Sequence, residues 1–176
     1  MTTPTDSSPA TAATTAPPRQ PTEADVALLA FAQSVEITAR DLYRKALEAG
    51  SGDDHEASLV AIAAHHDSYA QAISAVIGTA APQVRNDALF ELLGSRFAGN
   101  TSQTALAGHD LENQLVVTHR SLLANLDGIE GSTLVASIMI TEARHAAALA
   151  AIAGLSPITD IDAYLVTPEL VPLSPA

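Results

Sequence analysis

Proline is distributed unevenly along this chain, and its distribution decides where long helices can form. Of ten prolines, five lie in residues 1–21, four lie in residues 157–175, and one, Pro82, lies between them. Proline lacks the backbone N–H and clashes with the preceding helical turn, so the interior of an α-helix excludes it. Two long proline-free stretches remain, one on each side of Pro82, and each is long enough for two helices.

Both stretches have apolar side chains at intervals of three and four residues, which is typical of amphipathic helices. Thr22 and Asp25 have the spacing of a capping box at the start of the first stretch. Thr101 and Ser132 can cap the two helices of the second stretch. The sequence predicts helices at about 22–49, 53–77, 101–127 and 132–154, with glycine-containing turns at 50–52 and 128–131.

The segment between the two helical hairpins, residues 79–100, is longer than a simple turn and contains a short amphipathic piece at 86–93. About twenty extended residues reach roughly 60–70 Å, whereas a helix of about 27 residues is only about 40 Å long. This connection can therefore cross the whole bundle. We predict an all-α fold: an antiparallel four-helix bundle with one long crossover that carries a short helix.

The two ends of the chain have a different composition from the expected bundle, which spans residues 22–154. Residues 1–21 contain 17 Thr, Pro, Ala or Ser side chains, which can bury almost no apolar surface, so we expect a disordered tail. Residues 155–176 contain apolar side chains without a helical period. We expect this second tail to be extended and to lie on the bundle or on a partner.

Composition excludes several classes of function. The formal charge is −12 and aromatic residues are few, so we expect no nucleic-acid partner. The chain has no cysteine, which excludes disulfides, thiolate metal sites and a cysteine nucleophile. No apolar run approaches the roughly 18 residues that a membrane span needs, and no signal peptide is visible, so we expect a cytoplasmic protein without a membrane span.

Ionisable side chains interrupt the apolar stripe of each predicted helix near its middle. They are Glu36 in the first helix, His66 and Tyr69 in the second, Glu112 in the third, and Glu142 and His145 in the fourth. Counted from the turn of each hairpin, the carboxylates and imidazoles lie at heights that differ by only about 6 Å. Antiparallel packing would therefore gather them into one layer of the core.

Three buried carboxylates in one layer repel one another, so the bundle needs compensating positive charge there. A metal ion is one source: carboxylate oxygen with imidazole nitrogen suits iron, manganese or zinc, and Glu142-x-x-His145 places two ligands on one helix face. The histidines themselves, as imidazolium ions, are the other source. The spacing alone leaves both interpretations open.

Four short segments carry these residues: AFAQSVE at 30–36, HHDSY at 65–69, LEN at 111–113 and ITEARH at 140–145. Together they resemble the ferritin-like domain proteins common in actinobacteria, over about residues 23–154. The resemblance implies a centre with one Glu from each of two helices and a Glu-x-x-His pair from each of the other two. Glu36 and Glu112 look like the single carboxylates, and Glu142 with His145 looks like an intact pair.

The second helix departs from that family pattern. His66 stands where a bridging Glu belongs, and Tyr69 stands where the second His belongs. Losing a bridging carboxylate lowers the negative charge of the site and puts a standard oxo-bridged di-iron centre in doubt. A single metal ion, an asymmetric pair of ions and an empty site all remain open.

The site prediction follows from these patterns. Iron or manganese, as one or two ions if a metal is bound at all, is expected on Glu36, Glu112, Glu142, His145 and His66. Tyr69, Tyr43 and His119 are expected to hydrogen-bond to these ligands from outside the centre; Tyr43 and His119 lie about 10 Å along their helices from Glu36 and Glu112. We expect His55, His65 and His109, which fall off the stripes, to be solvated.

Three functions compete at this stage. The first is a metal-binding protein with oxidoreductase-like chemistry, in which iron or manganese reacts with oxygen or peroxide. The second is a metal-free structural or interaction bundle with a buried Glu/His network. The third is iron storage, which needs a large closed shell of many subunits, and nothing in the sequence specifies such a shell. A smaller homo-oligomer is compatible with the sequence.

Overall fold

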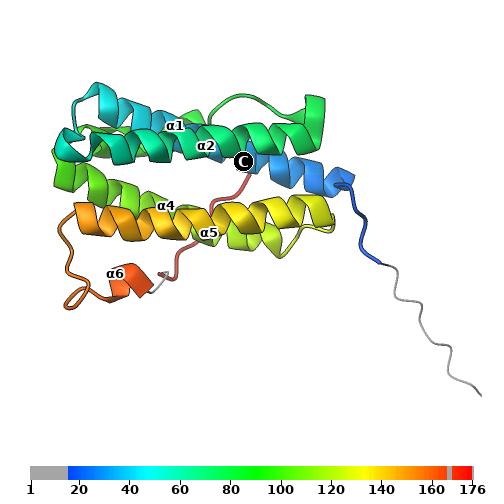
Figure 1. Ribbon diagram of the computed structural model, residues 1–176. Helices are drawn as coiled ribbons and strands as arrows, with labels where there is room; N and C mark the ends of the chain where they lie inside the picture. Colours follow the sequence, from blue (N-terminus) through cyan, green and yellow to red (C-terminus); the bar gives the residue numbers. More distant parts are fainter. Residues whose placement is uncertain (1–15, 166–167, 176) are drawn as a thin grey trace, which may run out of the picture.

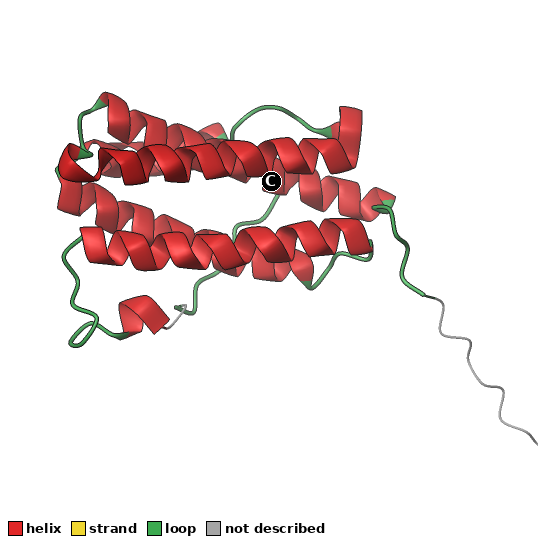
Figure 2. Ribbon diagram, viewed as in Figure 1, coloured by secondary structure: helices red, strands yellow, loops and turns green. Residues whose placement is uncertain are grey.

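A computed structural model describes residues 16–165 and 168–175, and throughout this part of the chain the regular structure is helical (Figure 2). The α-helices are α1 (Glu23–Glu48), α2 (Glu56–Ile77), α3 (Asp87–Gly94), α4 (Thr101–Leu123), α5 (Ile129–Ile152) and α6 (Asp162–Leu165). Short 3₁₀ turns at Asp53–His55, Gly78–Ala80 and Ser95–Ala98 lie between them.

The four long helices form two antiparallel hairpins, α1 with α2 and α4 with α5, that pack against each other (Figure 1). Between the hairpins the chain crosses from one end of the bundle to the other, so α4 runs in the same direction as α2. Across the bundle, α1 neighbours α4 and α2 neighbours α5. The predicted antiparallel bundle with a long crossover and a short helix, α3, is confirmed.

Some predicted helix boundaries are wrong in the second hairpin. Asn100, and not Thr101, caps α4, because its side chain accepts from the backbone N–H of Gln103 while the Gln103 side chain accepts from that of Asn100. The turn after α4 comes earlier than expected, and α5 already begins at Ile129. Ser132 lies inside α5, where its hydroxyl donates to the carbonyl of Gly128.

Asp25 fixes where this turn lies. Its carboxylate is fully buried and accepts hydrogen bonds from three backbone N–H groups, those of Thr22, Asp127 and Gly128, at 2.8–2.9 Å. The Thr22 hydroxyl accepts from the Asp25 N–H, which completes the predicted capping box. One carboxylate therefore joins the start of α1 to the α4–α5 turn and sets the two hairpins in register.

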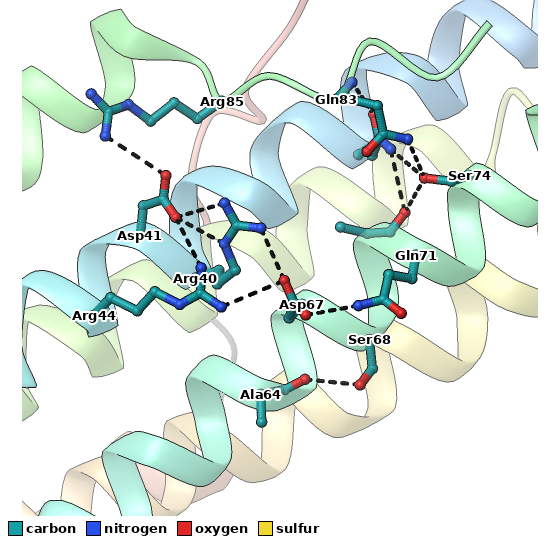
Figure 3. Close-up of polar contacts among 12 residues, drawn as sticks. Arg40, Asp41, Arg44, Ala64, Asp67, Ser68, Gln71, Ser74, Gln83 and Arg85 are labelled. Atoms are coloured by element: carbon teal, nitrogen blue, oxygen red, sulfur yellow. Dashed lines mark hydrogen bonds and ion pairs between the residues drawn. The ribbon is translucent and has the colours of Figure 1, made fainter. Parts of the chain in front are cut away.

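The crossover is fastened to α1 by polar contacts. The backbone N–H of Gln83 donates to the buried side chain of Gln33 at 2.9 Å, and the Gln83 side chain reaches Ser74 on α2 (Figure 3). Further along, the N–H of Asn86 donates to the Thr38 hydroxyl at 2.8 Å. These bonds satisfy the backbone of an irregular segment and hold it along α1.

An ion-pair network joins α1 to α2 on the surface beside the middle of the bundle. The Arg40 guanidinium binds Asp67 of α2 at 2.9 Å and Asp41 of its own helix at 2.8 Å (Figure 3). Arg40 lies one turn after Glu36, and Asp67 follows His66 directly. The network therefore aligns α1 and α2 at the height where their polar core residues lie.

The apolar core has two parts, one towards each end of the bundle. One cluster includes Leu42, Leu59 and Leu111, and the other includes Leu29, Ile73 and Ile138. On α2 and α5 the polar residues His66, Glu142 and His145 fall between the two clusters in sequence, whereas Glu36 on α1 and Glu112 on α4 are flanked by members of the Leu42 cluster. The helical bundle therefore has an apolar core towards each end and buried polar residues near its middle.

The structure describes part of each expected tail. Most of the expected disordered tail, residues 1–21, lies outside the described residues, but the carbonyls of Pro18 and Arg19 accept from Ile129 and Glu130 at the start of α5. The C-terminal segment includes the short helix α6 and returns along α4. There the N–H of Leu173 donates to the Thr118 hydroxyl at 3.1 Å.

Among the described residues, α5 is the one helix long and apolar enough to cross a membrane by length and composition. This is weak evidence for a span, because a core helix of a soluble bundle passes the same test. Here α5 packs against α4 and has Glu142 and His145 buried in the bundle.

Replacing Asp25 with alanine should lower the free energy of unfolding by about 2–4 kcal/mol, because the Thr22 N–H at the start of α1 and two N–H groups of the α4–α5 turn lose their acceptor. Urea denaturation followed by circular dichroism measures this change. Glu23→Ala, an exposed carboxylate in the same helical turn, is the control and should cost less than about 0.5 kcal/mol. Equal losses in the two variants would contradict the role given to Asp25.

Candidate metal centre

Six ionisable side chains meet in the middle of the bundle, and all six are buried. They form two groups, in each of which one ligand atom per residue lies within 4.8 Å of the others. The His66 triad comprises His66, Glu112 and His145, and the His119 triad comprises Glu36, His119 and Glu142. Each triad draws on three of the helices and combines carboxylate oxygen with imidazole nitrogen.

In the His66 triad every side chain is held by a hydrogen bond. His66 Nε2 lies 3.1 Å from Glu112 Oε1, and His145 Nδ1 lies 3.3 Å from Glu112 Oε2. The phenol of Tyr43 donates to Glu112 Oε1 at 2.5 Å, and its ring lies nearly parallel to that of His66. Glu112 is therefore the acceptor at the centre of this triad.

The His119 triad is less completely satisfied. His119 Nδ1 donates to Glu142 Oε2 at 2.8 Å, while His119 Nε2 lies 3.3 Å from Glu36 Oε1 without hydrogen-bond geometry. Three buried atoms, Glu36 Oε1, His119 Nε2 and Glu142 Oε1, have no hydrogen-bond partner among the described residues. Each of them is of a type that binds transition metals.

His66 joins the two triads. Its Nδ1 lies 2.7 Å from Glu36 Oε2, so the single ring bridges Glu36 of α1 and Glu112 of α4. Because a carboxylate accepts hydrogen bonds and cannot donate them when ionised, bridging two carboxylates requires an imidazolium with both N–H groups. His66 is thus a cation between two anions.

Electrostatics agree with this arrangement. Burial opposes protonation of His66, but Glu112 and then Glu36 outweigh it and hold the pKa of His66 well above its ordinary value. Burial also opposes ionisation of Glu112, yet the facing imidazoles lower the pKa of this carboxyl to about 2. Burial and the Glu112 carboxylate raise the pKa of the Tyr43 phenol far above its ordinary value, so Tyr43 stays a donor.

With both carboxyl groups ionised, the His119 triad would hold two negative charges against the one positive charge of His119. Burial raises the pKa of Glu142, and the carboxylates of Glu36 and Glu112 add to this against the opposing effect of His119. Despite its own burial, His119 has its pKa raised to about 9, chiefly by Glu142. In the absence of a metal, this triad is therefore expected to retain protons at neutral pH.

Helix geometry explains why the triads lie at two heights. Glu112 and His119 are two turns apart on α4, and Glu142 and His145 are about one turn apart on α5. Because α4 and α5 are antiparallel, the earlier residue of one helix faces the later residue of the other. Glu112 accordingly meets His145, and His119 meets Glu142.

The structure brings together all five predicted ligands: Glu36, Glu112, Glu142, His145 and His66. The expected single layer is instead two adjacent levels joined through His66. His119 was expected outside the ligands, but its ring lies between two of them, because the α4 and α5 side chains reach towards each other across the bundle. Tyr43 hydrogen-bonds to Glu112 as expected. Tyr69 was expected to do the same, but among the described residues it meets the ligands only through its half-buried ring, which lies edge-on to His66 with centroids 6.1 Å apart.

Two of the histidines expected to be solvated have specific contacts, whereas His55 is exposed as predicted. His65 is exposed, yet its Nδ1 lies 2.8 Å from His145 Nε2. Its position four residues before Tyr69, at the edge of the buried face, was the signal that could have found it. His109 is half-buried and its Nε2 donates to the carbonyl of Ala163, because the C-terminal segment covers it; nothing local in the sequence indicates this.

The donor set fits a transition metal ion. Carboxylate oxygen and neutral imidazole nitrogen suit iron, manganese and zinc, and the buried atoms that lack hydrogen-bond partners are of these types. A cation among them would satisfy all three atoms and offset the surplus of carboxylate charge. The His66 triad supplies two imidazoles and one carboxylate, the same donor composition as many non-haem iron sites.

Comparison with known proteins identifies a family. The family model for the ferritin-like domain matches residues 24–155, which covers all four long helices. Searches of curated proteins and of solved structures found no match.

In chelator-treated, metal-free protein we expect the free energy of unfolding to fall by roughly 1–3 kcal/mol as the pH rises from about 6.5 to 9. A histidine whose pKa is raised in the folded state contributes its full stabilisation of the fold at pH values below the ordinary histidine pKa of 6.5. For His119 this stabilisation is lost as the pH rises through the folded-state pKa of about 9. The measurement is a series of urea denaturation curves across this range.

The matched variant for this measurement is Glu142→Gln, which removes the carboxylate that raises the pKa of His119. Its stability should vary less steeply over the same pH range. A wild-type protein whose stability is constant from pH 6.5 to 9 would contradict the assigned charges.

Proposed function

Since this chain belongs to the ferritin-like domain family, we propose that it binds iron or manganese at the buried Glu/His centre, as one or two ions. The observation that carries the proposal is the set of three buried, unpaired ligand atoms in the His119 triad. When ionised, Glu36 and Glu142 also outnumber the one imidazolium of this triad, His119.

The His119 triad is the stronger of the two proposed sites. Leaving a buried carboxylate oxygen without a partner costs on the order of 1–3 kcal/mol, and here two such oxygens face one unpaired imidazole nitrogen. A water molecule would bond to these atoms but would leave the carboxylate charge in place. A divalent cation on Glu36, His119 and Glu142 removes both costs.

The His66 triad would hold a second ion less readily. Both nitrogens of His66 already bind carboxylates, so a metal ion has to displace a proton from this ring. Tyr69, where the family pattern has a histidine, is half-buried and close to His66. We therefore propose an asymmetric centre, in which the His119 triad fills first.

Iron or manganese, when bound, would supply one-electron chemistry towards oxygen or peroxide. The protein side chains would orient and protect the site. Tyr43 holds the Glu112 carboxylate in place through its phenol, and the apolar clusters above and below keep bulk water out. Oxidoreductase-like activity is our proposal on this basis.

Elemental analysis after anaerobic addition of Fe²⁺ or Mn²⁺, followed by desalting, tests the proposal. Wild-type protein should retain one or two ions per chain. Glu142→Gln should lower the metal affinity by more than about 100-fold, which is a larger loss than we expect on removing a residue that only hydrogen-bonds to a ligand. Glu130→Gln, an exposed carboxylate near the start of α5, is the control and should bind as wild type does. Wild-type protein that retains no metal would support the metal-free bundle instead.

Metal affinity should also increase as the pH rises from about 6 to 8, because the ion competes with protons on His66 and His119, whose pKa values are raised. Isothermal titration calorimetry with Mn²⁺ in buffers of different ionisation enthalpy measures both the affinity and the protons released. Binding without proton release would contradict the charge assignment of the metal-free centre.

A further inference from the structure

His65 makes an unusual contact for an exposed side chain. Its Nδ1 lies 2.8 Å from Nε2 of the buried His145, the ring centroids are 5.1 Å apart, and the rings are within 7° of parallel. Parallel rings stacked face to face would keep their nitrogens further apart than this, so the two imidazoles lie edge to edge. This is the geometry of an N–H···N hydrogen bond between rings.

His145 is therefore held at both ring nitrogens. Its Nδ1 faces Glu112 Oε2 at 3.3 Å, inside the His66 triad, and its Nε2 faces His65. A metal ion bound to the triad must take the Nδ1 lone pair, because this is the nitrogen that points into the centre. The proton of His145 then resides on Nε2, and His65 Nδ1 is the atom positioned to accept it.

We propose that His65 is a positioning residue for His145, which fixes the ring orientation and the tautomer that a metal ion in the His66 triad needs. The inference rests on the proposed function of that triad. Histidine ligands of metals commonly donate their second N–H to a carboxylate, a backbone carbonyl or water. Here a second imidazole takes that role.

An imidazole at this position has a property that a carboxylate or carbonyl lacks. A neutral imidazole has one donor and one acceptor nitrogen, and the two tautomers exchange through water. Because His65 is exposed, it can donate from Nδ1 when Nδ1–H of His145 binds Glu112, and accept at Nδ1 when a metal replaces that proton. His65 thus matches both states of the centre without leaving either nitrogen of His145 unpaired.

Co²⁺ titration of the full chain tests this role, with affinity from calorimetry and ligand geometry from the visible absorption of the bound ion. The variants are His65→Ala and His65→Gln, and His55→Ala is the control, since His55 is an exposed histidine just before α2 whose side chain makes no cap bond. We expect His65→Ala to weaken binding at one site by 10–100-fold and to change its absorption spectrum. His65→Gln should recover part of the affinity through its amide oxygen, and His55→Ala should match wild type.

A second readout follows the tautomer directly. Nitrogen-15 NMR of the Zn²⁺-loaded protein should show the Nε2–H tautomer for His145 in wild type and in His55→Ala, and a mixture or an exchange-broadened signal in His65→Ala. A purely structural role of His65 would change stability without changing this signal.

The outcomes distinguish the role of His65 from the proposed metal binding on which it rests. If wild-type protein binds Co²⁺ and His65→Ala has the same affinity, spectrum and His145 tautomer, the role of His65 is wrong while the metal site stands. If wild-type protein binds no Co²⁺, the proposed function fails and the inference fails with it.

Discussion

Three glutamates buried at the centre of an apolar bundle are the constraint from which the rest of this structure follows. Glu36, Glu112 and Glu142 have no exposed surface, and each ionised carboxylate would cost several kcal/mol in that position without a compensating charge. Part of the compensation is visible: His66 bridges two of the carboxylates, and His119 pairs with the third. The compensation is incomplete at the His119 triad, where three ligand atoms lack partners among the described residues, and this shortfall is the basis on which we propose a metal cation there.

The fold keeps this costly arrangement in place by fixing the height of each helix. Asp25 ties the start of α1 to the α4–α5 turn, and the Arg40–Asp67 ion pair aligns α1 with α2 beside the polar layer. The crossover is fastened along α1 through Gln33 and Thr38. A shift of one helical turn, about 5.4 Å, would separate every imidazole from its carboxylate, so correct register and a satisfied polar core stabilise each other.

Prediction from the sequence was most reliable for features that follow from the periodicity of the α-helix. The stripes that contain Glu36, Glu112 and Glu142 predicted both the bundle and the glutamates that face its interior, because helix periodicity determines which side chains share a face. Prediction was weaker where distance between helices matters: counting rise along α4 placed His119 outside the centre, yet antiparallel packing brings it against Glu142. The position of His65 at the edge of the buried face of α2 could have indicated its contact with His145, whereas the contact of His109 depends on a segment distant in sequence, and no local pattern indicates it.

Anomalous X-ray diffraction from crystals of the wild-type protein grown with Mn²⁺ tests the central claim most directly, because it locates the ion without reference to activity. The account predicts an anomalous peak within coordination distance of Glu36, His119 and Glu142, with any second peak at His66, Glu112 and His145. Peaks confined to the protein surface, with the imidazole–carboxylate contacts of both triads unchanged, would contradict it.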